Sequence, residues 1–288
     1  MRSSPLRNRL LLMATAVLFS TGGAAIKAAV FTPWQVASFR SAVAAAALLL
    51  VAPESRRRWS WRIAPVAAAY ASTLILFVLS TRMTTAANAI FLQNTAPFYL
   101  LLLGPWLLHE PVRRSDFGYL AALALGMSLF ALGGERALAT APNPHTGNIL
   151  ALASGLAWAF TLAGLRWVAR DGQGAAGVAA VTAGNLAACL VALPMALPVT
   201  TVSARGVAVI LYLGIFQIGL AYWCLTRAVR HVTAFEATTI LLLEPVLNPL
   251  WTWLVHGEKP GAWPLAGGAI ILSATLRHTW KQSREGRV

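Results

Sequence analysis

Long apolar runs, separated by short polar segments, follow one another along almost the whole chain. Most are about 20 residues long, which is the length that an α-helix needs to cross the hydrocarbon core of a bilayer. The pattern therefore predicts an all-α integral membrane protein with ten transmembrane helices, at residues 10–30, 34–52, 63–81, 86–108, 117–133, 147–168, 176–197, 205–225, 234–256 and 262–278. The fifth and tenth runs are short, but the prolines, glycines and charges that flank them favour separate helices.

One polar pattern occurs twice, at an offset of 148 residues. Residues 85–126 and 233–274 share a polar helix entry, a proline within the helix and an acidic residue after it. These are Asn88, Pro97 and Glu110 in the first copy, and Glu236, Pro245 and Glu258 in the second. An internal repeat on this scale indicates a duplicated architecture. The chain is thus expected to form two five-helix repeats, residues 1–140 and 141–288.

Composition agrees with a membrane protein. With 58% hydrophobic and 11% charged residues and a mean hydropathy of +0.65, the chain lacks the charged surface of a soluble protein of this size. A net charge of +14 raises the question of nucleic acid as a partner. The basic residues, however, form short clusters between apolar runs and no single patch, which argues against nucleic acid and for membrane lipids as neighbours.

The basic residues also predict the orientation. If the N-terminus is cytoplasmic, seventeen Lys and Arg residues fall on the inner side and five on the outer side, with Arg40 within a helix. The positive-inside rule then places both termini in the cytoplasm, in the bacterial inner membrane. Because each half has an odd number of helices, the second half enters from the opposite side. Inverted repeats of this kind build alternating-access carriers, whose substrate site lies between the halves near the midplane.

These features resemble the drug/metabolite transporter superfamily, EamA type, over nearly the whole chain. The resemblance rests on the doubled spacing and helix count, with Phe19-Ser20 matched by Trp158-Ala159, and Pro97 and Glu110 matched by Pro245 and Glu258. Within the superfamily the chain is most similar to the YddG-like exporters of aromatic and other neutral amino acids. The resemblance implies a ten-helix basket in which helices 1, 3, 4, 6, 8 and 9 line a central cavity and helices 5 and 10 lie toward the periphery.

Glu244 is the clearest candidate for coupling. It lies within the ninth run directly before Pro245, and Asn248 and Trp251 follow on the same helix face. A charge inside the membrane is costly and tends to face a partner or water. Glu244 is therefore a proton or cation site, or a contact for a substrate ammonium, or alternatively a neutral hydrogen-bonding group between helices.

Two basic residues also fall within helices. Arg40 is the natural counter-charge for a coupling site or charge relay. A structural ion pair or a snorkelling side chain is favoured for it, because the second helix is not among those implied to line the cavity. Lys27, near the outer end of the first helix, is expected to snorkel to the interface and is a weaker candidate for a substrate carboxylate.

Uncharged groups complete the predicted substrate site. Asn88, Gln93 and Asn94 offer both donors and acceptors, which a carboxylate and an ammonium need, just before the break that Pro97 predicts. The alternative is that these amides join helices. Deep aromatic residues suit flat, apolar or cationic substrates, and Tyr70, Trp158 and Tyr222 are the chosen ones, with core packing as the alternative.

Signals of catalysis are weak. The five histidines form no metal-spaced cluster, and Cys189 and Cys224 lie in different apolar runs. No phosphate-binding loop or nucleophile elbow is present, so no enzymatic activity, cofactor or metal is expected, nor a self-contained ATP-driven pump.

The sequence thus predicts a carrier that exports small solutes, foremost aromatic or neutral amino acids and related metabolites, and works as a monomer. Export of other metabolites or of aromatic cationic drugs stays open, as does the choice between proton coupling and facilitated flux. A membrane-embedded enzyme or a lipid-handling protein is the alternative from another class.

Overall fold

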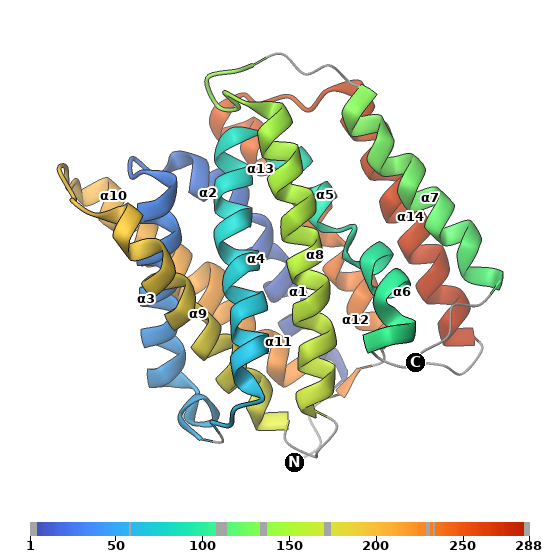
Figure 1. Cartoon of the computed structure of the whole chain (residues 1–288), viewed down its shortest axis with the longest axis horizontal. Coiled ribbons are helices and arrows are strands. Elements are labelled where there is room, and N and C mark those ends of the chain that lie inside the picture. Colours follow the sequence, from blue (N-terminus) through green and yellow to red (C-terminus); the bar gives the residue numbers. More distant parts are fainter. Residues whose placement is uncertain are drawn as a thin grey trace.

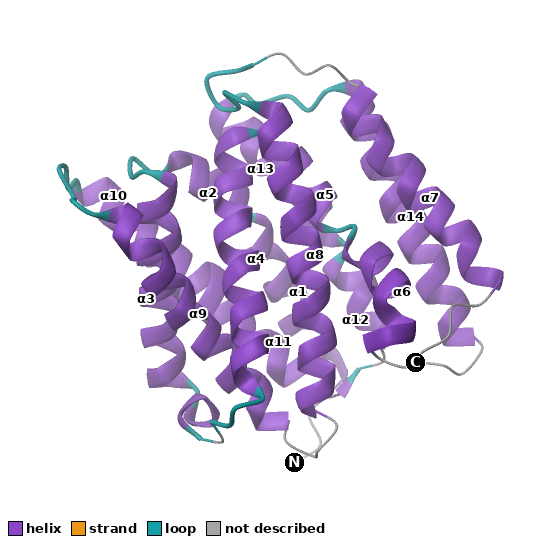
Figure 2. Ribbon diagram, in the orientation of Figure 1, coloured by secondary structure: helices purple, strands orange, loops and turns teal. Residues whose placement is uncertain are grey.

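The computed structural model describes residues 5–57, 59–107, 114–132, 137–169, 174–228, 231–232 and 234–284, and their regular elements are all helices (Figure 2). Seven helical spans in this part of the chain are long and apolar enough to cross a membrane: Leu6–Ala28, Pro33–Val51, Ile63–Met83, Ala86–Pro105, Pro144–Val168, Ala176–Ala196 and Ala204–Ala228. A shorter apolar helix covers Asp116–Phe130. The predicted all-α membrane fold is therefore confirmed, whereas ten crossings remain an expectation.

The helices follow the predicted apolar runs to within a few residues. The first half contains α1 (Pro5–Ser20), α2 (Gly22–Ala28), α3 (Pro33–Val51), η1 (Pro53–Arg56), α4 (Ile63–Met83), α5 (Ala86–Gln93), α6 (Ala96–Leu107) and α7 (Arg114–Leu132). The second half contains α8 (Pro144–Ala169), α9 (Gly174–Ala196), α10 (Ala204–Leu211), the π-helix η2 (Tyr212–Leu220), α11 (Ala221–Ala228), α12 (Ala234–Leu241), α13 (Leu243–His256) and α14 (Ala262–Arg284).

Side chains at the helix ends explain where several helices begin and stop. Thr32 and Gln35 form a capping box at the start of α3, with Pro33 in the first turn. Thr85 accepts a hydrogen bond from the backbone N–H of Asn88 and so caps α5. At the end of α13, Gly257 takes a left-handed conformation, with φ of 67°, that favours glycine.

The two repeated prolines produce two matching breaks. The chain leaves the helix at Asn94 and Thr95, between α5 and α6, and at Leu242, between α12 and α13. Pro97 and Pro245 follow these breaks, and a proline removes a backbone donor and crowds the preceding turn. The kink predicted beside Pro97 is confirmed, and it is a complete interruption of the helix. A third break, at Thr21, separates α1 from α2.

Helices from both halves build the centre of the bundle. α4 packs against α8 and α9, and α3 packs against α9 and η2. α7 and α14 pack on each other at one edge of the molecule (Figure 1), where the Tyr119 and Thr275 hydroxyls are 3.1 Å apart. Figure 1 also shows that α1 begins and α14 ends at the same end of the bundle.

Gly23 permits a close approach of α2, α5 and α13. A Cβ atom at this position would lie 2.4 Å from Oδ1 of Asn248 on α13 and 3.0 Å from Cβ of Ala86 on α5. Both distances are too short for an unstrained contact, and Asn248 is buried. The packing of α2 against α5 and α13 therefore depends on a residue without a side chain.

Gly23→Ala should lower the free energy of unfolding by about 1–3 kcal/mol, because the added methyl group overpacks this three-helix contact. Thermal unfolding of the purified protein in detergent micelles measures the change. Gly118→Ala is the matched control, since nothing lies within 4 Å of a Cβ on this helical residue of α7. It should be neutral or stabilising by up to about 1 kcal/mol. Equal stability of Gly23→Ala and wild type would contradict the close approach.

Candidate functional site

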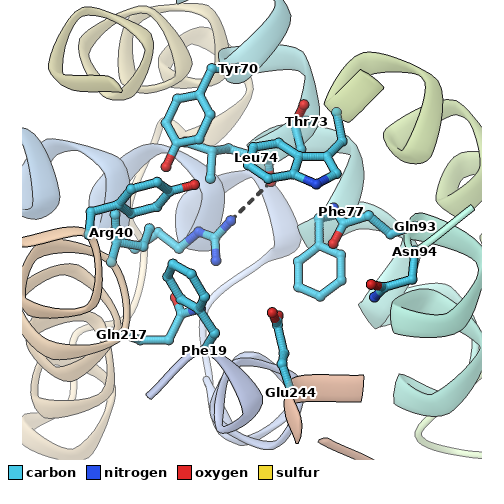
Figure 3. Close-up of a pocket in the computed structure, with 13 residues that line it drawn as sticks. Phe19, Arg40, Tyr70, Thr73, Leu74, Phe77, Gln93, Asn94, Gln217 and Glu244 are labelled. Carbon is cyan, nitrogen blue, oxygen red and sulfur yellow. Dashed lines mark hydrogen bonds between the residues drawn. The ribbon is translucent and has the colours of Figure 1, made fainter. Parts of the chain in front are cut away.

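A cavity lies between helices of the two halves (Figure 3). It contains about 640 Å³ of atom-free space, part of which is open to solvent. The residues that line it are Phe19, Arg40, Tyr70, Thr73, Leu74, Phe77, Gln93, Asn94, Trp158, Gln217, Ile218, Tyr222 and Glu244. They come from α1, α3, α4, α5, α8, η2, α11 and α13, with Asn94 at the end of α5.

Irregular backbone segments position several of these residues. Gln93 and Asn94 lie at the end of α5, directly before its break, and Glu244 lies directly after the break that follows α12. Gln217 and Ile218 belong to the π-helix η2. Interrupted helices in a membrane are tolerated where they border protein or a cavity, and π-helical turns are frequent at functional sites. The cavity is thus lined where the helices depart from regular geometry.

Among the described residues that line the cavity, Arg40 is the only basic one. Its side chain is 1% exposed, and Nη2 donates a hydrogen bond to the backbone oxygen of Leu74, 3.0 Å away. Nε has no hydrogen-bond partner. Figure 3 shows the guanidinium group directed into the space between Leu74 and Phe19. In the described part of the chain, no carboxylate lies within ion-pair distance of Arg40.

Glu244 is the only acidic residue in the part of the cavity lining that the structure describes. Its side chain is partly buried, and in Figure 3 its carboxyl group points into the same central space as the Arg40 guanidinium. Glu244 forms no ion pair with any residue that the structure describes. The described lining of the cavity therefore contains the Arg40 guanidinium and the Glu244 carboxyl group, which do not pair directly.

Polar side chains connect one wall of the cavity to neighbouring helices. Nε2 of Gln93 donates to Oγ of Ser154 on α8 over 2.8 Å, and this hydroxyl donates to the backbone oxygen of Thr73 over 3.2 Å. Asn94 donates locally, from Nδ2 to the backbone oxygen of Ile90. Gln93 therefore joins α5 to α8 and α4, in addition to facing the cavity.

Aromatic rings form the opposite wall. The Tyr222 ring lies edge-on to Phe19, with ring centroids 5.2 Å apart, and edge-on to Tyr70, with centroids 5.6 Å apart. Tyr70 is buried, whereas Trp158 and Tyr222 are partly buried. Edge-to-face packing holds the rings in place and leaves apolar surface for a ligand to contact.

The structure brings most of the predicted site residues together. Gln93, Asn94, Tyr70, Trp158, Tyr222, Glu244 and Arg40 all line the cavity, and their binding and coupling roles stay predictions. Asn88 does not line it. Asn88 is buried and donates from Nδ2 to Oδ1 of Asn148, 3.0 Å away, which also accepts a hydrogen bond from Thr84.

One expectation about the cavity is wrong, and some of its lining residues were not predicted. The premise that the second helix stays away from the cavity is wrong, because α3 brings Arg40 to its wall. The sequence reading also missed Thr73 and Leu74. They share a face of α4 with Tyr70 and Phe77, at a spacing of three to four residues, so helical periodicity from the two aromatic residues could have found them.

Lys27 lies in a second charged cluster and does not reach the interface as expected. Its Nζ is 2.8 Å from Oε2 of Glu258, and both side chains are 2% exposed. Lys27 also donates to the backbone oxygens of Thr84 and Thr140. Oε1 of Glu258 accepts a hydrogen bond from the N–H of Ala86, 2.6 Å away, at the positive end of α5. Glu110, the repeat counterpart of Glu258, lies outside the described residues.

Glu258→Ala should lower the free energy of unfolding by about 3–5 kcal/mol, because it leaves the buried ammonium of Lys27 without its counter-charge. Thermal unfolding in detergent micelles measures the loss. Combining Lys27→Met with Glu258→Leu replaces the pair by apolar side chains and should restore most of the stability. If the single and double variants unfold at the same temperature, the two charges do not stabilise each other.

Comparisons with known proteins give one family and several relatives. The EamA-like transporter family matches residues 8–132 and 145–277, once in each half. The uncharacterised protein PA1977 of Pseudomonas aeruginosa is 29% identical over 304 residues, covering 98% of this chain and 99% of that protein. The pseudopaline exporter CntI of Pseudomonas aeruginosa is 25% identical over 206 residues, covering 70% of this chain and 69% of that protein. A solved crystal structure with 17% identity shares the fold, with a TM-score of 0.62 over 96% of this chain and 98% of that one.

Proposed function

Since the chain belongs to the EamA-like transporter family, we propose that it exports small organic solutes across the bacterial inner membrane by alternating access. Aromatic and other neutral amino acids and related metabolites are the proposed cargo. The observation that carries this proposal is the cavity between the halves, which combines aromatic walls with the unpaired Arg40 and Glu244. Such a cavity offers stacking surface to an apolar side chain and opposite charges to an amino acid backbone.

The helix contacts support an inverted repeat. When the two halves are exchanged, the packing of α4 on α8 corresponds to that of α11 on α1, and α4 on α9 corresponds to η2 on α3. The contacts of α5 and α6 with α8 correspond to those of α12 and α13 with α1. We propose that the ten crossings are the seven long apolar spans together with α7, the broken pair α12 and α13, and α14.

The position of Glu244 supports proton-coupled export. A bare carboxylate is costly to move through a membrane interior, whereas a protonated carboxyl group is not. Protonation of Glu244 would therefore let the empty carrier reorient, and deprotonation would prepare the cavity for a cationic group. A carrier of this kind exchanges protons for substrate.

Aromatic cations are the second candidate cargo. Glu244 and the rings of Phe19, Trp158 and Tyr222 are the groups that recognise such cations through charge and cation–π contacts. CntI is a pseudopaline exporter, which supports export as the direction of transport for this chain. No observation favours the enzyme or lipid-handling alternative.

Counterflow into liposomes tests the proposed function. Vesicles with purified protein are loaded with an unlabelled solute and diluted into the same solute in labelled form. The panel comprises aromatic and neutral amino acids, other carboxylate-bearing metabolites and aromatic cations. We expect labelled amino acids to accumulate transiently in protein-containing vesicles and not in protein-free ones. Absence of counterflow for the whole panel would argue against transport of these solutes.

Both termini should be accessible only from the cytoplasm, because the positive-inside pattern places them there. Single cysteines at Ser4 and Ser283, in a chain with Cys189→Ala and Cys224→Ala, are treated with a membrane-impermeant maleimide. Neither should react in intact cells, and both should react in inverted vesicles. Lys259→Cys, on the exposed loop before α14, is the control that should react in intact cells. Reaction of either terminal cysteine in intact cells would overturn this topology.

Glu244→Gln should retain counterflow but lose the response of flux to an imposed pH gradient, because glutamine keeps the shape of the side chain and cannot titrate. Flux in proteoliposomes, with and without the gradient, measures this difference. Glu54→Gln, which alters an exposed carboxyl group on η1, is the control and should respond as wild type does. An unchanged gradient response in Glu244→Gln would assign Glu244 a hydrogen-bonding role and favour facilitated flux.

A further inference from the structure

The guanidinium group of Arg40 has more N–H donors than the surrounding residues have acceptors for it. A guanidinium group has five N–H donors, and the described residues give Arg40 one hydrogen bond, to the backbone oxygen of Leu74. Nε is buried without a partner. A cation with so few partners in an apolar interior is costly. Arg40 therefore has donors that the described residues do not use.

Arg82 has a structural role and can be compared with Arg40. Its Nη1 donates to the backbone oxygens of Ile26, Lys27 and Ala29, and its Nη2 donates to that of Phe31. These bonds cap the end of α2, and Arg82 borders no part of the cavity. Arg40, in contrast, lies within α3 away from both ends and keeps its donors directed into the cavity. Neither capping nor snorkelling explains it.

A carboxylate matches the free donors of Arg40. Guanidinium groups bind carboxylates with two parallel hydrogen bonds, and an arginine stays protonated at physiological pH. Glu244 supplies the opposite charge elsewhere on the cavity wall, and it has no basic partner among the described residues. Phe19 and Phe77 flank the space between the Arg40 guanidinium and the Glu244 carboxyl group in Figure 3. A solute with only a cationic group would leave Arg40 without a counter-charge.

We infer that Arg40 binds the carboxylate of the transported solute, and that the cavity selects solutes whose second, cationic group faces Glu244. This inference rests on the proposed transport function and names its substrate class. Arg40 is thereby the specificity-determining residue, since it requires the solute to be a carboxylate. An α-amino acid with an apolar side chain has a carboxylate for Arg40, an ammonium group for Glu244 and an apolar surface for the aromatic wall.

Neutralising the carboxylate of the solute tests the inference. Each amino acid and its amide are compared as competitors of counterflow of the labelled amino acid. The pairs are L-phenylalanine with L-phenylalaninamide and L-leucine with L-leucinamide. Any other transported carboxylate is compared with its own amide. Wild type should bind each amide at least about tenfold more weakly, as expected for the loss of hydrogen bonds between charged groups. In Arg40→Met this preference should fall below about threefold. Arg205→Met, at an exposed position outside the cavity, should keep the wild-type ratio.

The outcomes of these competition experiments separate failure of the inference from failure of the proposed function. If wild type binds acid and amide equally, or if Arg40→Met keeps the wild-type ratio, the inference is overturned while transport stands. Transport restricted to aromatic cations overturns it as well. A melting temperature of Arg40→Met clearly below that of wild type would assign Arg40 a structural role and overturn the inference. If no solute on the panel is transported, the proposed function itself fails.

Discussion

The fold depends on one constraint, which is that a lipid interior offers no water to unpaired backbone groups. The chain nevertheless has breaks at Thr21, at Asn94 and Thr95, and at Leu242, and side chains at two of them add hydrogen bonds to the preceding turn. Thr21 donates to the backbone oxygen of Leu18, Asn94 to that of Ile90 and Thr95 to that of Leu92. None of the residues at these breaks is exposed. The same breaks bring Gln93, Asn94 and Glu244 to the cavity.

Three cations within the described helices are stabilised in different ways. Lys27 is neutralised by Glu258 and two backbone carbonyls, and the partly buried Arg82 donates to four backbone carbonyls. Arg40 has one carbonyl and an open cavity. The first two arrangements hold helix ends together. The third leaves hydrogen-bonding capacity unused, and that unused capacity is what distinguishes a binding group from a structural one.

Much of the fold and of the cavity lining could be predicted from the sequence, because the length of apolar runs and the repeated prolines are local signals. The helix limits, the break beside Pro97 and most cavity residues follow from such local signals. The surroundings of Arg40 and Lys27 could not be predicted in the same way. The direction of Arg40 depends on how α3 rotates against α9 and η2, and the partner of Lys27 lies near the other end of the chain. Apolar periodicity is weak when a helix is apolar on all sides, so it leaves these rotations open.

The ion pair between Lys27 and Glu258 has a consequence for biosynthesis. Lys27 is translated before Glu258, which follows α13. Until Glu258 is in place, the ammonium of Lys27 lacks its counter-charge, and its long side chain can reach water at the membrane surface. The final packing of α2 against the start of α5 therefore requires a residue that is translated after α13.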